Sequence, residues 1–262
     1  MEIVLLGSGN VATHLATALN EAGYRIVQLY SRTMRNAELL ASKVGAEPVE
    51  RVDTLYRAAD FYIFSVKDAA LPEIVSQMPP TTGIWVHTAG SVPLSALSPH
   101  KERGVLYPLQ TFSKERELDL RDIPFFIEGE SSATIAMLNE LVKSISEKVF
   151  LLSGDKRRLL HLAAVFASNF TNHMYTLASE IMDEEGLQFF LLHPLIAETA
   201  AKAMTMDPHA AQTGPALRFD EEVIKKHLDL LSDPMKKELY ALLSKSIHKR
   251  SSEQCVGRNY RP

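Results

Sequence analysis

The stretch MEIVLLGSGNVA at residues 1–12 decides the fold, and a helical pattern links it to LYSR at residues 29–32. An apolar run at residues 3–6 leads into a GxGxxA turn, and a second apolar run follows at residues 25–30. Strand, glycine turn, helix and strand in this order indicate a dinucleotide-binding unit, whereas an isolated glycine motif is weak evidence. The cofactor-binding residues expected from the turn are Gly7, Ser8, Gly9, Asn10, Val11 and Ala12.

Each position of this turn has a physical role. Gly7 allows the tight turn out of the strand, and Gly9 lets the backbone approach a pyrophosphate. Ala12 keeps the helix close to the sheet. Free N–H groups at the helix N-terminus attract the anion.

The end of the second strand indicates which dinucleotide binds. An NAD site normally has Asp or Glu about 20 residues past the glycines, where it binds the ribose 2′-hydroxyl. Here Ser31 and Arg32 stand at that point, and Arg35 follows one helical turn later. A hydroxyl and a guanidinium suit a 2′-phosphate, so we expect NADP(H). The alternative is that both arginines are solvated loop cations.

The bulk properties are those of an ordinary globular protein. At 262 residues the chain has room for one large or two modest domains. A net charge of −4 without a basic helix argues against a nucleic-acid partner. The single cysteine, Cys255, leaves no disulfide framework and no cysteine metal site. No apolar run approaches the ~20 residues of a membrane span and the N-terminus has no signal peptide, so we expect no membrane partner and a cytoplasmic location.

The pattern along the chain predicts two domains. Short apolar runs alternate with amphipathic segments over residues 1–153, which is typical of a doubly wound parallel α/β sheet. From residue 154 to 248 the pattern is helical, and its first helix covers residues 155–185. Residues 249–262 are polar and aperiodic, so we expect a mobile tail or one that docks on a partner.

Large apolar side chains are too many for one thin helical layer. Leu159, Phe166, Phe170, Met174 and Leu177 lie on the first helix, and residues 189–191 add three more on the next. The helical half is therefore expected to form a homodimer.

Loops at the carboxyl ends of the strands are the expected ligand site of such a sheet. Ser65, Val66 and Thr88 follow two buried strands, and we expect them beside the nicotinamide and its ribose. Lys67 could instead be a solvated charge, and His87 a satisfied, half-buried histidine. Gln110 and Thr111 follow Pro108, which turns the chain out of the sheet. Gln110 is expected to bind substrate; the alternative is a simple connector.

A polar stripe marks the long helix. At 100° per residue His161, Ser168 and Asn172 fall within a narrow sector, and Asn169 lies beside it. These types suit a partly buried site that places hydrogen bonds, with His161 as proton donor and Asn169 and Asn172 as catalytic partners. Ser168 would contact substrate. A buried polar seam between helices is the alternative.

The loop at residues 212–220 is the last expected part of the site. Thr213 offers a hydroxyl, and Arg218 could hold a substrate carboxylate in a bidentate pair. Arg218 could equally pair with the acids that follow it. Asp220 is better placed as the N-cap of the next helix.

Several of these motifs resemble one family. GSGNVA, SR, HTAGS, YPLQTF, HLAAVFASN and TGPALRFD look like a Rossmann-like family that carries the domain of unknown function 2520. Its architecture is similar to pyrroline-5-carboxylate reductase and, more distantly, to the β-hydroxyacid dehydrogenases. The resemblance implies an NADP-binding domain, then a helical dimerisation domain, with the active site between them. It implies no substrate.

The sequence departs from those enzymes at the expected catalytic helix. β-Hydroxyacid dehydrogenases have a catalytic Lys there with Asn one turn later, but here Lys156 is followed by Leu160 and His161 by Val165. Their mechanism therefore cannot be transferred. Pyrroline-5-carboxylate reductases have a run of small residues in this helix, where this chain has His161 and the two asparagines.

Two functions from different classes follow. The first is an NADP(H)-dependent oxidoreductase that reduces a small polar C=O or C=N compound in the interdomain cleft. The second is a non-catalytic NADP(H)-binding sensor or scaffold. A deazaflavin as hydride partner stays open, because fold analogy alone does not choose between them.

Overall fold

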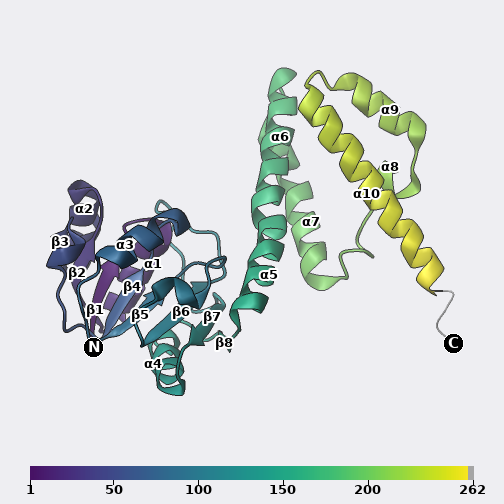
Figure 1. Cartoon of the computed structure of the whole chain (residues 1–262). Helices are drawn as coiled ribbons and strands as arrows, with labels where there is room; N and C mark the ends of the chain where they lie inside the picture. The colour runs from purple at the N-terminus through teal and green to yellow at the C-terminus, as the bar shows by residue number, and fades with distance from the viewer. Residues whose placement is uncertain (259–262) are drawn as a thin grey trace. The chain divides into compact units, whose positions relative to one another are not determined.

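One eight-stranded sheet organises the first part of the chain in the computed structural model, which describes the backbone of residues 1–258 and the side chains of residues 1–251. The strand order is β3-β2-β1-β4-β5-β6-β7-β8 (Figure 1). The strands are β1 (Glu2–Leu6), β2 (Arg25–Tyr30), β3 (Glu47–Val49), β4 (Phe61–Phe64), β5 (Ile84–His87), β6 (Arg103–Pro108), β7 (Phe125–Gly129) and β8 (Val149–Leu151). Neighbours run parallel except β6 and β7, which pair antiparallel.

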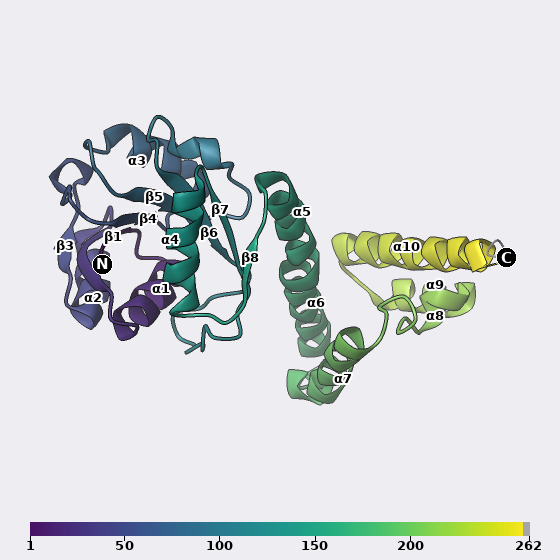
Figure 2. The same cartoon turned by 90° about the horizontal axis from the view of Figure 1, so that it is seen from below.

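Alternation along β1 builds a core on each face of the sheet. Ile3 and Leu5 join one buried cluster, and Val4 and Leu6 join the other, because successive side chains of a strand point to opposite faces. The first cluster lies under α1 (Asn10–Glu21), α2 (Met34–Val44) and α4 (Ser132–Lys143), and the second under α3 (Leu71–Gln77). Figure 2 shows this layering from below. The predicted doubly wound fold is thus confirmed.

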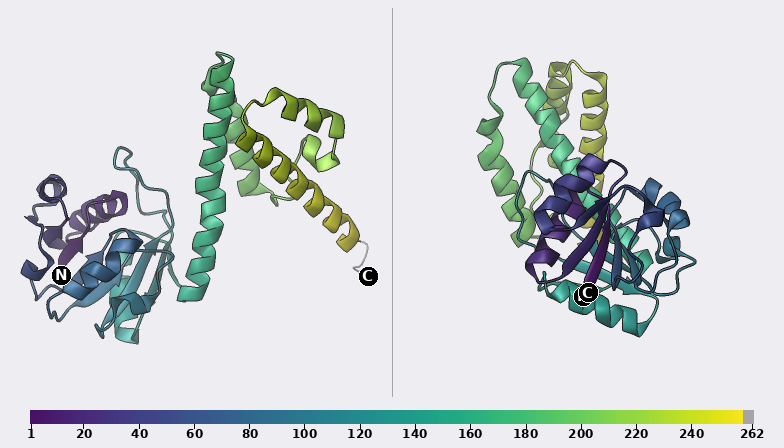
Figure 3. Two further views of the ribbon diagram at one scale, coloured as in Figure 1. Left: turned by 45° about the horizontal axis from the view of Figure 1, so that its top comes forward. Right: turned by 90° about the vertical axis from the view of Figure 1, so that its left-hand side faces the viewer.

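The order of the strands reverses at β1. The chain proceeds from β1 through β2 to β3 on one side and then crosses to β4 on the other, so β1 and β4 are direct neighbours. Such a switch point opens a crevice at the carboxyl ends of the strands, where ligands of open α/β sheets bind. The fanned, twisted sheet is visible in the right panel of Figure 3.

The rest of the described chain is helical. The segments are α5 (Gly154–Ala164), a π-helical stretch (Val165–Phe170), α6 (Thr171–Glu184), α7 (His193–Thr205), α8 (Pro215–Arg218), α9 (Glu221–Leu230) and α10 (Pro234–Arg258). None of the helices in the described residues is long and apolar enough to cross a membrane.

Contacts divide the chain into two compact units between Asn169 and Phe170, later than the predicted boundary at residue 153. α5 begins at Gly154, close to where the sequence indicated a helix. Its side chains nevertheless contact the sheet, since Arg157 bonds to Val92 and His161 to Tyr107. α5 therefore belongs to the sheet unit.

α10 continues to Arg258, beyond the predicted helix end at His248. A solvated helix end needs no apolar periodicity, and Lys, Arg, Glu and Gln are good helix formers, so polarity alone was a poor indicator of the end. The side chain of Cys255 and residues 259–262 lie outside the described residues, so the predicted mobility of the tail stays a prediction.

Candidate functional site

Gly7 brings the first turn against the loop after β4. Its φ of 122° lies in a region that residues with a side chain rarely adopt, and a Cβ there would be 2.1 Å from the Ser65 carbonyl oxygen. The Gly7 amide donates to the Tyr30 carbonyl at 2.8 Å. Glycine at this position therefore holds the ends of β1, β2 and β4 together.

The N-terminus of α1 is open to an anion. A Cβ on Gly9 would meet no atom within 4 Å, and Gly9 provides no side-chain cap to the helix. The first turn carries no acidic residue, and within the described residues the amides of Asn10, Val11 and Ala12 have no recorded acceptor. Ala12 itself is fully buried against the sheet. These donors fit the pyrophosphate of a dinucleotide.

Two exposed arginines follow the end of β2. Ser31 is buried and accepts from the Ser8 hydroxyl at 2.9 Å, so these two side chains lie beside the glycine turn. Arg32 and Arg35 are exposed, and neither forms an ion pair with any described residue. The site has the cations that a 2′-phosphate needs and no carboxylate that would repel it.

The loops after β4 and β5 continue the same edge. The Ser65 amide donates to the Leu6 carbonyl at 2.7 Å, and the Thr88 amide donates to the Phe64 carbonyl at 3.2 Å. Val66 packs on the core beside Ser65. The structure thus brings together all the predicted cofactor residues from Gly7 to Thr88 along one line of strand ends.

The segment after β6 reaches back to the glycine turn. The Asn10 side-chain amide donates to the Phe112 carbonyl at 2.7 Å, and His14 Nε2 lies 3.0 Å from the Ser113 carbonyl. Gln110 is exposed, and its side-chain oxygen accepts from the Thr111 amide at 2.8 Å. Asn10 therefore has a structural bond in addition to any role with a ligand.

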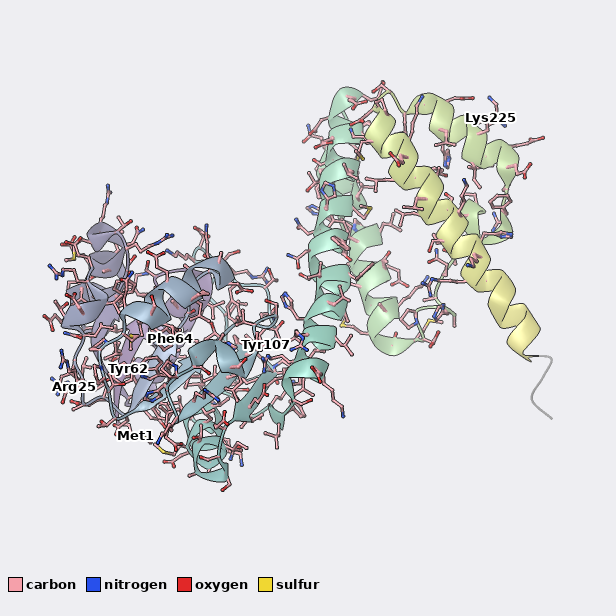
Figure 4. The ribbon with its side chains drawn as sticks, in the orientation of Figure 1. Met1, Arg25, Tyr62, Phe64, Tyr107 and Lys225 are labelled. Atoms are coloured by element: carbon pink, nitrogen blue, oxygen red, sulfur yellow. The ribbon has the colours of Figure 1, made fainter. Side chains whose placement is uncertain are left out.

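His161 lies at the other end of this edge. Its Nδ1 is 2.9 Å from the Tyr107 hydroxyl, and the two rings meet edge to face with centroids 5.8 Å apart. A Cβ on Gly90 would come within 2.7 Å of His161 Nδ1, so the loop after β5 passes directly against the pair. Figure 4 shows Tyr107 at the margin of the sheet near the start of α5.

Two buried side chains, Arg157 and His87, lie near the start of α5. Arg157 is fully buried, donates to the Val92 carbonyl at 2.6 Å and forms an ion pair with Glu128. His87 is also buried, and its Nε2 has no hydrogen-bond partner in the structure. Burial, with a smaller effect of the Arg157 charge, lowers the pKa of His87 from 6.5 to about 3. His87 is therefore neutral at physiological pH, and only one of its ring nitrogens is satisfied, because Nδ1 accepts from the Ala89 amide at 3.3 Å.

The remaining predicted residues of the polar stripe lie beyond α5, in the π-helical stretch and in α6. Ser168 is half-buried, Asn169 and Asn172 are exposed, and no hydrogen bond joins their side chains to His161 among the described residues. The π-helical stretch at Val165–Phe170 has more residues per turn than an α-helix, so a stripe counted at 100° per residue does not carry across it. The alignment of Asn172 with His161 stays a prediction.

The loop before α9 is described with the helical unit. Thr213 and Arg218 are exposed, and Arg218 forms no ion pair with Asp220, Glu221 or Glu222 within the described residues. The Asp220 carboxylate accepts from the Val223 amide at 3.2 Å, which confirms it as the N-cap of α9.

Sequence reasoning did not select Tyr107, Gly90 or Arg157. Tyr107 precedes the proline that ends β6, and Arg157 stands one helical turn before His161, so both positions carried a usable signal. A hollow of about 940 Å³ lies in the sheet unit between α1, the loop at residues 114–121 and the end of α4, and none of the predicted site residues lines it. Both acidic and basic side chains line this hollow. Because the predicted cofactor residues lie at the strand ends, we place the candidate site there.

Family models match both parts of the chain. Residues 2–86 match the family described as NADP oxidoreductase, coenzyme F420-dependent, and residues 123–247 match the domain of unknown function DUF2520. Protein BF3122 from Bacteroides fragilis, provisionally named an NADP oxidoreductase, is 47% identical over 95% of this chain and 98% of that chain, with a TM-score of 0.89. This chain belongs to the DUF2520 family. The comparison with curated proteins found no match.

More distant structures share the fold of this DUF2520 protein. A reductive aminase from Aspergillus terreus, solved with NADPH and ethyl-5-oxohexanoate, is 16% identical over 96% of this chain and 87% of that chain, with a TM-score of 0.63. A pyrroline-5-carboxylate reductase from Coxiella burnetii is 13% identical over 96% of this chain and 97% of that chain, with a TM-score of 0.54. The architectural likeness to pyrroline-5-carboxylate reductase expected from the sequence is confirmed.

Proposed function

We propose that this protein is an NADP(H)-dependent oxidoreductase that reduces a small polar C=O or C=N compound. The observation that carries the proposal is the shared edge of the sheet. The open N-terminus of α1 lies at one end of this edge. At the other end lies His161, whose Nδ1 is hydrogen-bonded to Tyr107. Reduction of such a compound needs a hydride donor and a proton donor at one carbon–heteroatom bond, and this edge has a place for each.

The residues along this edge suit the successive parts of NADP(H). Amides at Gly9 and Asn10–Ala12 would hold the pyrophosphate, and Ser31 with Arg32 would hold the 2′-phosphate. Ser65, Val66 and Thr88 would line the nicotinamide and its ribose. When bound, the reduced nicotinamide supplies a hydride. The NADPH complex of the Aspergillus terreus enzyme supports this assignment at the level of the fold.

His161 is the proposed proton donor. Its Nδ1 faces the Tyr107 hydroxyl, no described residue bonds to its Nε2, and the ring is half-buried. An imidazole N–H directed at a substrate can serve in general acid catalysis. A C=N substrate is the favoured class because the related folds include a reductive aminase and a pyrroline-5-carboxylate reductase.

The remaining predicted residues are proposed as substrate ligands. Gln110 lies on the segment after β6, and Ser168 and Asn169 follow His161 on the long helix. Asn172, Thr213 and Arg218 belong to the helical unit. The proposal assigns them polar contacts to substrate, and alanine variants that raise the KM for substrate without changing NADPH affinity would support each one.

We also propose that the helical unit forms a homodimer. Among its described side chains only Lys236 and Ser244 are buried, while Leu195, Met204 and Leu230 are 64%, 79% and 81% exposed. An apolar cavity of about 380 Å³ opens between α6, α9 and α10. Covering a leucine-sized side chain contributes about 1.5–3 kcal/mol, so a second copy would stabilise the unit. A monomer in sedimentation at micromolar concentration would refute this proposal.

His161→Ala tests the function directly. Turnover should fall by about 10²–10⁴-fold while NADPH affinity is unchanged, because the donor acts only in the chemical step. His173→Ala is the matched control, since His173 is exposed on α6 and has no assigned role. Full activity in His161→Ala would remove His161 from the mechanism. NADPH binding without oxidation across a broad panel of imines and keto acids would favour a sensor or scaffold.

A further inference from the structure

Tyr107 has a hydroxyl group that the proposed function leaves unexplained. The side chain is 8% exposed, at the end of β6, and the one recorded partner of its hydroxyl among the described residues is His161 Nδ1 at 2.9 Å. A buried phenol almost always finds a hydrogen-bond partner, and this one finds a nitrogen of the proposed proton donor.

The proton of this bond belongs to the tyrosine. Burial raises the pKa of Tyr107, and the nearby Arg157 charge opposes that effect only in part. The hydroxyl therefore keeps its proton at neutral pH. Nδ1 is the one recorded partner of this hydroxyl among the described residues, so a hydroxyl that accepted from Nδ1–H would leave its own proton without an acceptor. The hydroxyl is therefore assigned as the donor and Nδ1 as the acceptor. A neutral imidazole that accepts at Nδ1 must carry its own proton at Nε2.

The surroundings hold the ring in that arrangement. Gly90 leaves no room beside the pair, because a Cβ there would be 2.8 Å from Tyr107 Cζ and 2.7 Å from His161 Nδ1. Arg157 stands one helical turn before His161, and its bonds to Val92 and Glu128 fasten that turn of α5 to the sheet unit. Rotation of the imidazole away from Tyr107 would break this part-buried hydrogen bond, and no other partner of Nδ1 is recorded among the described residues.

We propose that Tyr107 is a positioning residue that locks His161 in the Nε2–H tautomer, so that Nε2–H is the group offered to a ligand. The proposal rests on the proposed function only for the role of that proton. In the reduction, the substrate carbon accepts a hydride and its heteroatom takes the Nε2 proton. The Tyr107 proton moves to Nδ1 in the same step, which avoids an imidazolate. Solvent then protonates Nε2, and Nδ1 returns its proton to the phenolate, which restores the starting tautomer. Arg157 stabilises the transient phenolate.

Nitrogen NMR of the histidine rings tests the tautomer without any substrate. In ¹⁵N-histidine-labelled protein at neutral pH, the His161 signals, identified by their loss in His161→Ala, should show an unprotonated Nδ1 and a protonated Nε2. Tyr107→Phe keeps the ring and removes the hydroxyl, so the tautomers should mix. A protonated Nδ1 in the wild type, or an unchanged tautomer in Tyr107→Phe, would overturn the proposal.

The chain has a matched control for this experiment. His227 Nδ1 lies 2.7 Å from the Tyr240 hydroxyl in the helical unit, and those rings also meet edge to face. Tyr240→Phe should alter the His227 signals and leave those of His161 and the turnover unchanged. Tyr107→Phe should lower turnover by about tenfold at unchanged NADPH affinity, the effect of one lost hydrogen bond. If His161→Ala stays fully active while the wild-type tautomer is as stated, His161 is removed from the mechanism and the positioning stands. NADPH binding without oxidation of any compound would end the proposed function and leave the tautomer result untouched.

Discussion

His87 makes the stability of the sheet unit depend on pH. It is 1% exposed at the end of β5, and burial together with the Arg157 charge lowers its pKa from 6.5 to about 3. The unfolded chain therefore binds a proton at this histidine below pH ~6.5, and the native state does not until pH ~3. Stability from His87 is complete above the unfolded pKa and is lost as the pH falls through this window.

The size of the effect follows from the same two values. A pKa shift of one unit corresponds to about 1.4 kcal/mol, so His87 removes about 2 kcal/mol of stability between pH 7.5 and 5 and at most about 5 kcal/mol by pH 3. His87→Leu removes the titrating group. The difference in unfolding free energy between wild type and variant should therefore change by about 2 kcal/mol over pH 7.5 to 5.

The sequence supplies its own probe for this measurement. Trp85 is the only tryptophan, is 5% exposed and lies in β5 two positions before His87, so its fluorescence reports unfolding of the sheet unit. The His100 ring stacks on it at 4.3 Å, so denaturation midpoints and slopes are compared rather than intensities. His173→Gln, at an exposed site, is the control. Parallel pH curves for wild type and His87→Leu would refute the reasoning.

Three further predictions concern the turn, the cofactor and a helix cap. Gly7→Ala should lower the free energy of unfolding by about 3 kcal/mol or more, because of the positive φ at this position and the clash of a Cβ with Ser65. Gly9→Ala places its Cβ in open space, so it should keep the stability and weaken NADPH binding. Chemical denaturation measures the first effect and fluorescence titration with NADPH the second. Arg32→Glu should raise the Kd for NADPH by about 10–100-fold and leave NADH binding nearly unchanged, and equal effects on both would remove Arg32 from the 2′-phosphate site. Asp220→Ala should lower helical-unit stability by about 1 kcal/mol in circular dichroism, with Asp220→Asn retaining it.

Local signals predicted the sheet unit well. The turn at Gly7 and the burial of Ala12 follow from residue type and spacing, because only glycine tolerates the backbone and only a small side chain fits against the sheet. The N-cap at Asp220 is equally local. The antiparallel pairing of β7 with β6 left no trace in the strand patterns, since a buried run looks the same in either direction.

Long-range contacts explain what the sequence did not predict. Tyr107 and His161 meet only because β6 ends beside α5, and a pattern of single segments contains no information about that distance. Arg157 looked like an ordinary helix cation, yet it is fully buried. The π-helical stretch at Val165–Phe170 has a different number of residues per turn from an α-helix, so the 100° repeat does not hold there. No residue type in this stretch indicates the change.

The central claim is hydride transfer from bound NADPH with His161 as proton donor. Single-turnover loss of NADPH fluorescence, with enzyme in excess and a panel of cyclic imines and keto acids, tests it most directly. The account predicts rapid loss with at least one imine in the wild type, and loss slowed by about 10²–10⁴-fold in His161→Ala. Tight NADPH binding with no oxidation by any compound, or equal rates in both proteins, would contradict it.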